Sequence, residues 1–223
     1  MSKPADTVVE KTLPIKPRPT RRMRAKQAHP KPTIEERLLA ALERMLDQGH
    51  SFATLSIEQL TTEASMSRGT FYLHFKDKGE LVARLMKVVT DEIVISTGTW
   101  LANARKADRS DIVAAVDGVA QTFRRHHAIV AAVTSMAPHD KAVAALYDEM
   151  MDTIAMHCRR SMSIVKKAGK SRPKADNHVA DALAWMVLLY CTRFASEKSG
   201  PDFKQMVDAM GYICVSAIFA DDA

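Results

Sequence analysis

The sequence predicts an all-α protein. From Thr33 onward, apolar residues recur at helical spacing in one stretch after another. No stretch alternates apolar and polar residues over the length of a strand, which would be the pattern of a half-buried sheet. Helix-breaking residues, among them Gly49, Pro138 and the pair Gly200-Pro201, divide the apolar stretches. These three observations together predict a succession of helices.

Residues 1–32 differ from the rest of the chain. They hold six of the nine prolines, and nine Lys or Arg against Asp6 and Glu10, which is a local charge of +7. Because the whole chain carries +6, the remaining 191 residues carry −1. With few large apolar residues, this segment is expected to be a disordered basic tail. The tail either follows nucleic-acid phosphates, or only solubilises the protein, or reflects a wrongly assigned start codon.

Three helices should follow the tail. Thr33 with Glu36, and Ser56 with Gln59, form the capping-box pattern that satisfies backbone donors at a helix start. Ser67 can cap a third, short helix after a tight turn. One side of that helix is aromatic, and the other carries a cation, hydroxyls and a glycine. Such an outer side suits a DNA groove.

The rest of the chain is predicted to form longer helices with apolar faces. Their expected ranges are 77–102, 110–125, 126–136, 139–167, 176–198 and 202–220. The last two are apolar almost all round, so they need cover on two sides. A second copy of the chain is the simplest cover, giving a four-helix homodimer interface that would include Met210 and Ile218. A fully buried central helix pair in a monomer is the alternative.

Composition excludes several classes of protein. Hydrophobic residues make up 47% and charged residues 26%, as in soluble globular proteins. The longest apolar runs span about ten residues, whereas a membrane helix needs roughly 20. No apolar signal-peptide core is present, so we expect a cytoplasmic, nucleoid-associated protein without a membrane partner. Cys158, Cys191 and Cys214 are odd in number and widely spaced, which predicts buried free thiols.

Residues from Thr33 to about Val89 resemble the N-terminal DNA-binding domain of the TetR family of bacterial transcriptional regulators. The run ASMSRGTFYLHF (64–75), followed by Lys76-Asp77-Lys78, is close to the family pattern A-G-V-S-[KR]-G-T-[LF]-Y-x-[HY]-F-x-[SD]-K-x-x-L. The match is dense and therefore specific, and it covers about a quarter of the chain. The remainder agrees with the family in length and helical character. Ser65 replaces the usual turn glycine, so we expect the turn to be either slightly strained by a left-handed serine or differently shaped; Thr61 replaces an alanine.

The resemblance implies a role for the polar residues of this segment. Arg68 is the candidate for bidentate recognition of guanine, worth about 1–3 kcal/mol of discrimination. Tyr72, His74 and Lys78 occupy positions where family members contact phosphates. The full set of expected DNA contacts is Ser56, Ser67, Arg68, Gly69, Thr70, Tyr72, His74 and Lys78.

The resemblance also implies that a C-terminal helical domain binds a small molecule and forms the dimer. The pocket candidates are large and apolar, several with a polar tip: Trp100, Phe123, Tyr147, Met151, Trp185, Met186 and Tyr190. No charged residue stands isolated within these apolar faces, which favours a neutral, hydrophobic effector. The helical layout and the tryptophans are similar to those of the EthR-like subgroup.

No enzyme class is indicated. The histidines form neither H-x-x-x-H nor H-E-x-x-H, and no zinc spacing, G-x-S-x-G or glycine-rich phosphate loop occurs. We therefore expect no catalytic residues, no metal and no cofactor.

The predicted organisation is a basic tail (1–32), a helix-turn-helix DNA-binding domain (33–80), and a ligand-binding and dimerisation domain (81–223). The predicted function is a homodimeric repressor that releases a palindromic DNA operator when a hydrophobic small molecule binds. Two alternatives remain: a DNA-binding regulator without an effector, in an architectural or activating role, and an enzyme that uses the C-terminal pocket.

Overall fold

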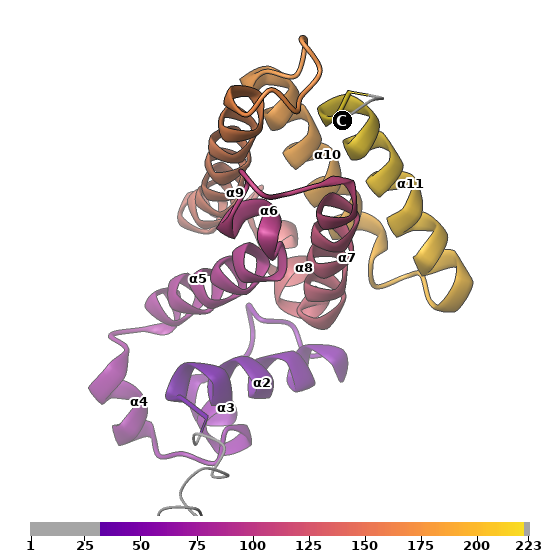
Figure 1. Ribbon diagram of the computed structural model, residues 1–223. Coiled ribbons are helices and arrows are strands. Elements are labelled where there is room, and N and C mark those ends of the chain that lie inside the picture. Colours follow the sequence, from indigo (N-terminus) through magenta and orange to yellow (C-terminus); the bar gives the residue numbers. More distant parts are fainter. Residues whose placement is uncertain (1–31, 221–223) are drawn as a thin grey trace, which may run out of the picture. The chain divides into compact units, whose positions relative to one another are not determined.

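The computed structural model describes residues 32–220, and the regular secondary structure in this range is helical (Figure 1). One isolated backbone bridge pairs Ser171 with Phe219, and no named strand occurs among these residues. None of the described helices is long and apolar enough to cross a membrane. The all-α prediction is confirmed. The predicted tail lies almost wholly outside the described residues.

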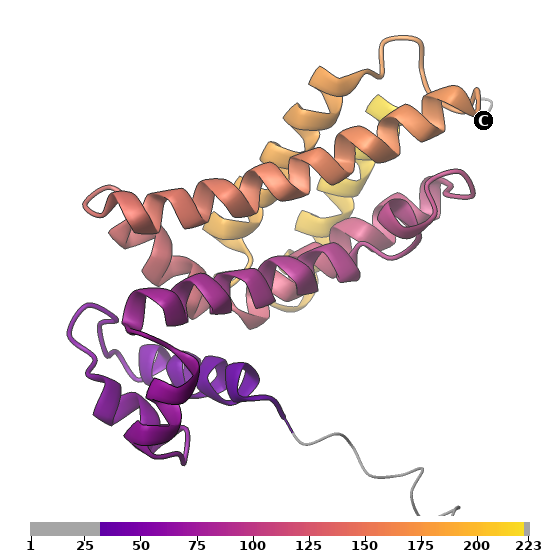
Figure 2. The ribbon, with the colours of Figure 1, turned by 90° about the vertical axis from the view of Figure 1, so that its left-hand side faces the viewer.

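The helices follow one another with short connections. Their bounds are α2 (Ile34–Asp47), α3 (Ile57–Glu63), α4 (Arg68–His74), α5 (Lys78–Ser96), α6 (Thr99–Ala102), α7 (Arg109–Arg125), α8 (His127–Met136), α9 (Lys141–Lys167), α10 (Asn177–Phe194) and α11 (Gly200–Ile218). The described residues from Thr33 onward form one compact unit, within which we call helices α2 to α4 the N-terminal domain and helices α5 to α11 the C-terminal domain. Helix α5 leads from the N-terminal domain into the larger C-terminal domain, where α5 and α9 lie side by side (Figures 1 and 2).

The N-terminal domain has one compact apolar core. Leu38 and Leu42 from α2 are buried, as are Leu60 from α3 and Phe71 and Phe75 at α4. The two phenylalanine rings lie 5.2 Å apart between centroids. Because every helix of the domain contributes to this core, the orientation of α4 is fixed by packing.

The predicted caps are present. Thr33 and Glu36 form a full capping box at α2, and Ser56 and Gln59 form one at α3. At α4, the hydroxyl of Ser67 accepts a hydrogen bond from the backbone N–H of Thr70, at 3.0 Å. These local contacts fix where each short helix begins.

The turn between α3 and α4 has the strained backbone that the sequence predicts. Ser65 adopts φ = 53°, in the left-handed region where a serine costs about 1 kcal/mol more than a glycine. Arg37 of α2 stabilises this turn, since its guanidinium donates to the carbonyl oxygens of Ala64 and Ser65, both at 2.7 Å. Next to it, Arg44 pairs with Glu63 at 2.7 Å. Two arginines of α2 thus hold the end of α3.

The long helix predicted over 77–102 is in fact two helices. Helix α5 ends at Ser96, and Gly98 then takes φ = 54°, which turns the chain before the single turn of α6. The close approach of α7 accompanies this end, because a Cβ atom on Gly118 would lie 2.2 Å from the carbonyl oxygen of Ser96. The helical periodicity of the sequence carried no sign of this break.

The last two helices bury one face and expose another. Met210 and Ile218 are each 3% exposed and pack inside the protomer, so the expectation that they form the dimer interface was wrong. Large apolar side chains on the outer faces of α10 and α11 are instead exposed: Trp185, Leu189, Tyr190, Tyr212 and Ile213. The apolar character that the sequence shows all round these helices thus divides between the core and an uncovered surface.

Candidate DNA-binding surface and effector cavity

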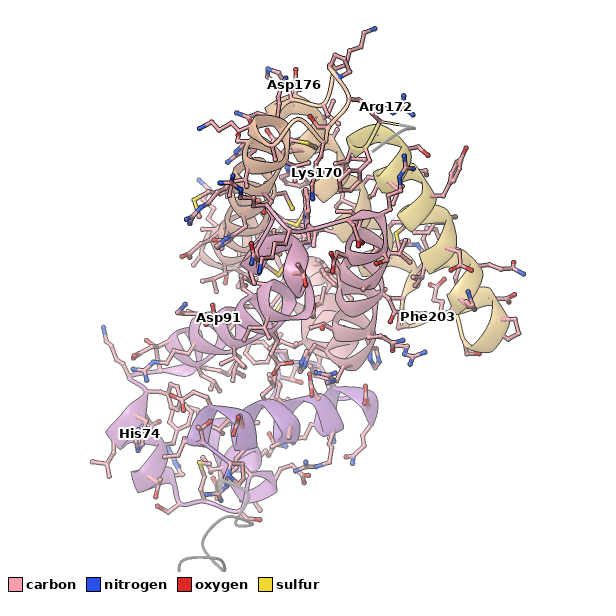
Figure 3. All side chains as sticks on the ribbon, viewed as in Figure 1. His74, Asp91, Lys170, Arg172, Asp176 and Phe203 are labelled. Carbon is pink, nitrogen blue, oxygen red and sulfur yellow. The ribbon has the colours of Figure 1, made fainter. Side chains whose placement is uncertain are left out.

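Helix α4 presents one side to the core and the other to solvent. Phe71 is fully buried, whereas Arg68, Gly69, Tyr72 and His74 are exposed. His74, labelled in Figure 3, lies at the end of α4, at the edge of the N-terminal domain. The structure therefore brings the predicted DNA-contacting residues of α4 onto one accessible helix.

The N-terminal half of α4 combines a cation with two hydroxyls. Arg68 is accessible, and its guanidinium lies 3.9 Å from the carboxylate of Glu58, a long and exposed pair. Such a pair is weak in water, so the guanidinium is available to a stronger anionic or bidentate partner. The hydroxyls of Ser67 and Thr70 lie 2.9 Å apart. Ser56 heads α3 and is exposed as well.

The C-terminal half of α4 is aromatic and apolar. Tyr72 is 50% exposed, and its ring packs edge-on against Phe71 with 5.4 Å between centroids. This contact holds the tyrosine while its hydroxyl stays accessible. Leu73, which the sequence analysis did not select, is 83% exposed. Its position two residues from both Phe71 and Phe75, on the opposite side of the helix, was the signal that could have identified it.

Lys78 has a different place from the phosphate contact that the resemblance implied. Its ammonium lies 2.5, 3.2 and 2.9 Å from the carbonyl oxygens of Phe52, Ala53 and Leu55. It also lies 4.4 Å from the centroid of the Phe52 ring, and burial lowers the pKa of the lysine. Since an ammonium has three donors, all are engaged within the chain. Lys78 therefore positions the loop before α3 and has no donor left for a phosphate.

An apolar cavity lies inside the C-terminal domain. Its volume is about 60 Å³, and its wall comes from the α5–α6 junction and from α7, α9, α10 and α11. Trp100, Val116, Leu183 and Val187 are among the lining residues. Ligand pockets for drug-sized molecules measure about 300–1,000 Å³. A molecule of that size would need the cavity to expand.

The predicted pocket residues separate into three groups. Trp100 lines the cavity. Phe123 and Met151 are buried elsewhere in the core, and Tyr147 and Met186 pack partly buried against it. Trp185 and Tyr190 are 37% and 41% exposed on the outer face of α10. Apart from Trp100, these residues do not line this cavity.

The thiols belong partly to this cavity. Cys158 and Cys214 line it, and all three cysteines are free, as predicted. Burial raises the pKa of Cys158 to about 11 and that of Cys214 to about 12. The thiols are therefore protonated at neutral pH and poorly nucleophilic. No metal-binding group of His, Cys, Asp or Glu occurs within residues 32–220.

A buried histidine joins the two domains. His126, at the α7–α8 corner, is almost fully buried; its Nδ1 lies 2.5 Å from Glu43 of α2, and its Nε2 lies 2.8 Å from Glu92 of α5. Burial lowers its pKa, but the hydrogen bonds and charges of the two carboxylates outweigh burial and raise the pKa above its ordinary value. Arg125 also pairs with Glu92, at 3.0 Å. With both ring nitrogens facing carboxylates, the imidazolium is the form that this site holds.

Comparisons with known proteins agree with this geometry. Residues 38–85 match the family model described as bacterial regulatory proteins, tetR family. The HTH-type transcriptional regulator EthR of Mycobacterium tuberculosis is 23% identical over 189 residues, covering 83% of this chain and 87% of EthR.

Solved structures share the fold. SmeT, the repressor of the Stenotrophomonas maltophilia multidrug efflux pump SmeDEF, matches with a TM-score of 0.64 at 19% identity, over 86% of this chain and 92% of SmeT. A TetR-family regulator from Mesorhizobium loti matches with a TM-score of 0.66 at 14% identity, over 91% of this chain and 100% of its own. At such identities, the likeness concerns the fold. Together with the family match over residues 38–85, it shows that the helix-turn-helix segment and the helical fold are similar to those of TetR-family transcriptional regulators.

Proposed function

We propose that this protein is a homodimeric repressor that binds a palindromic operator and releases it when a hydrophobic small molecule enters the C-terminal cavity. The observation that carries the DNA-binding part is the accessible face of α4, with Arg68 and Tyr72 held by a well-packed domain. Ser56, Ser67, Gly69, Thr70 and His74 remain proposed contacts. SmeT, which shares the fold, is described as a repressor.

The exposed faces of α10 and α11 support the dimer. Trp185 and Leu189 lie one helical turn apart on α10, and Tyr212 and Ile213 lie on α11, at exposures between 37% and 74%. Large apolar side chains gathered on neighbouring helices favour an interface. A twofold dimer would present two copies of α4 to two half-sites about one DNA turn apart.

The position of the cavity supports an effector. Thr97 and Trp100 at its wall flank the end of α5, and α5 begins directly after α4. A ligand that enlarges the cavity would displace this end of α5, and a rigid helix passes the displacement to the DNA-binding domain. The ligand can shift the equilibrium only by the difference between its affinities for the two arrangements.

Selection of bound sequences from random duplex DNA, with the full-length protein, tests the DNA-binding part. We expect a palindromic site to be enriched, and Arg68→Ala to relax the base preference at one position of each half-site. Arg105→Ala is the matched control, because Arg105 is exposed in the connection between α6 and α7. Absence of any enriched sequence would contradict the proposal.

A thermal-shift screen of neutral hydrophobic molecules, followed by operator release, tests the effector part. Ala184→Leu places a larger side chain in the cavity wall and should abolish both the thermal shift and the release. Ala145→Leu, at an exposed position of α9, should change neither. If compounds released the operator equally from both variants, the cavity would not be the effector site.

A further inference from the structure

Leu73 is the most exposed of the large apolar side chains in residues 32–220, at 83%. It lies on α4, the helix that carries the proposed DNA contacts, and not on the exposed faces of α10 and α11. An isolated exposed leucine on a protein surface needs no explanation. A leucine at the centre of the proposed DNA-binding face does need an explanation.

Helix geometry places Leu73 at that centre. Phe71 and Phe75 mark the buried side of α4. At 100° per residue, the opposite direction is occupied by Gly69 and Leu73, four residues apart and one above the other. Arg68 and Tyr72 lie on one side of this line, and Thr70 and His74 lie on the other. The middle of the recognition face is therefore apolar, with its hydrogen-bonding groups at the sides.

Gly69 leaves room along the same line. A Cβ atom built there would have only the hydroxyl of Ser67 nearby, at 3.6 Å. The glycine is therefore not required by crowding within the protein. Its missing side chain allows a base pair to approach the backbone of α4 one turn before Leu73.

Neither residue offers a side-chain donor or acceptor to a base edge. The apolar group that the major groove presents is the C5-methyl of thymine. We propose that Leu73 contacts the C5-methyl group of one thymine in each operator half-site and so specifies an A·T pair at that position. This inference rests on the proposed DNA-binding function of α4 and adds the chemical identity of one base to it.

The size of the effect follows from the group that is buried. One methyl group removed from water on both half-sites changes affinity about fourfold per half-site and about fifteenfold for the dimer. The effect is smaller than that of a bidentate arginine but specific to one position, so it can be separated from a general loss of binding.

The test replaces thymines of the selected operator with deoxyuridine, which keeps base pairing and removes only the methyl group. For the wild-type protein, we expect one position in each half-site where this replacement weakens binding about fourfold. For Leu73→Ala, the replacement at that position should have no effect, while thymines elsewhere behave as in the wild type. Ile95→Ala, which removes a similarly exposed apolar side chain from α5, serves as the matched control and should keep the thymine preference at this position.

The possible outcomes distinguish failure of the DNA-binding proposal from failure of the thymine contact at Leu73. If no operator is enriched at all, the DNA-binding proposal fails. If an operator is enriched but wild type and Leu73→Ala respond equally to every deoxyuridine, Leu73 does not read a methyl group. Leu73→Ser provides a second variant, and the thermal midpoint of both variants should match the wild type because the side chain is exposed.

Discussion

The loops around α3 and the wall of the cavity are held by different means. In the N-terminal domain, cations donate to backbone carbonyls: Arg37 to the turn after α3, and Lys78 to the loop before it. In the C-terminal domain, the cavity wall is almost entirely apolar and is held by side-chain packing. Directional bonds fix one geometry, whereas apolar contacts tolerate repacking. The geometry of the loops around α3 is thus specified more narrowly than that of the cavity wall.

The largest expected effect comes from disturbing the packing of the helices that surround the cavity. Gly118→Ala should cost about 3 kcal/mol of unfolding free energy, because its Cβ atom would lie 2.2 Å from the backbone carbonyl of Ser96. Gly211→Ala is the control, since its Cβ would meet a side-chain methyl of Val113 at 3.3 Å. That change should be nearly neutral, as the removal of a helical glycine offsets a small shift. Denaturant unfolding measures both; equal losses would contradict the close α5–α7 contact.

The second prediction removes the directional hydrogen bonds that Lys78 donates to backbone carbonyls. Lys78→Met should lower the unfolding free energy by about 2–3 kcal/mol, because it leaves three carbonyl oxygens without their charged donor. Lys76→Met, at an exposed neighbouring position, should be nearly silent in stability. If Lys78 contacted a phosphate, the substitution would instead reduce the salt dependence of DNA binding while stability stayed constant. Chemical denaturation and a salt titration of operator affinity distinguish these results.

The third prediction sharpens the comparison at the joint between the domains. Because the folded pKa of His126 is raised, the protonated ring contributes stability fully below its ordinary pKa of about 6.5. This contribution is lost as pH rises through the folded pKa. His126→Gln should therefore cost about 2 kcal/mol at pH 6 and progressively less at higher pH.

Unfolding free energies measured between pH 6 and pH 9 test this contribution of His126 to stability. His139→Gln, at an exposed position, should follow the wild type throughout. Both variants keep the paired groups Glu43, Glu92 and Arg125, so the difference between the variants reports the histidine. A pH-independent cost of His126→Gln would mean that the ring is not protonated in the folded protein.

The smallest effect concerns the turn. Ser65→Gly should raise the unfolding free energy by about 1 kcal/mol, since glycine accepts φ = 53° without strain. Ser65→Ala retains the strain and should give no gain. Thermal unfolding of the two variants measures the difference. A gain from alanine as large as that from glycine would mean that the turn is not strained.

Sequence reasoning succeeded where the determinants are close in the chain. The caps at Thr33, Ser56 and Ser67 and the left-handed Ser65 all depend on neighbours within a few residues, and each is present. The cavity was not predictable, because its wall combines α7, α9, α10 and α11 and depends on which helix face turns inward. Trp100 was identified, whereas Trp185 was placed inside although it faces out.

Lys78 shows the limit of reasoning by position. Its place in the family pattern implied a phosphate contact, but the carbonyls that it binds come from residues 23 to 26 positions earlier in the chain. A local pattern does not contain such contacts. The gap between α5 and α6 has a similar cause, since it depends on the approach of α7 at Gly118.

The thiols in the cavity wall make opening of the C-terminal domain measurable as a rate of chemical labelling. Cys214 is buried and its pKa is raised to about 12, so it reacts with thiol reagents only when the wall opens and water reaches it. The labelling rate of Cys214 therefore reports opening of the C-terminal domain. An effector that fills the cavity should slow the labelling of this thiol, and one that only loosens the helices should accelerate it. No substitution in the chain is needed for this measurement.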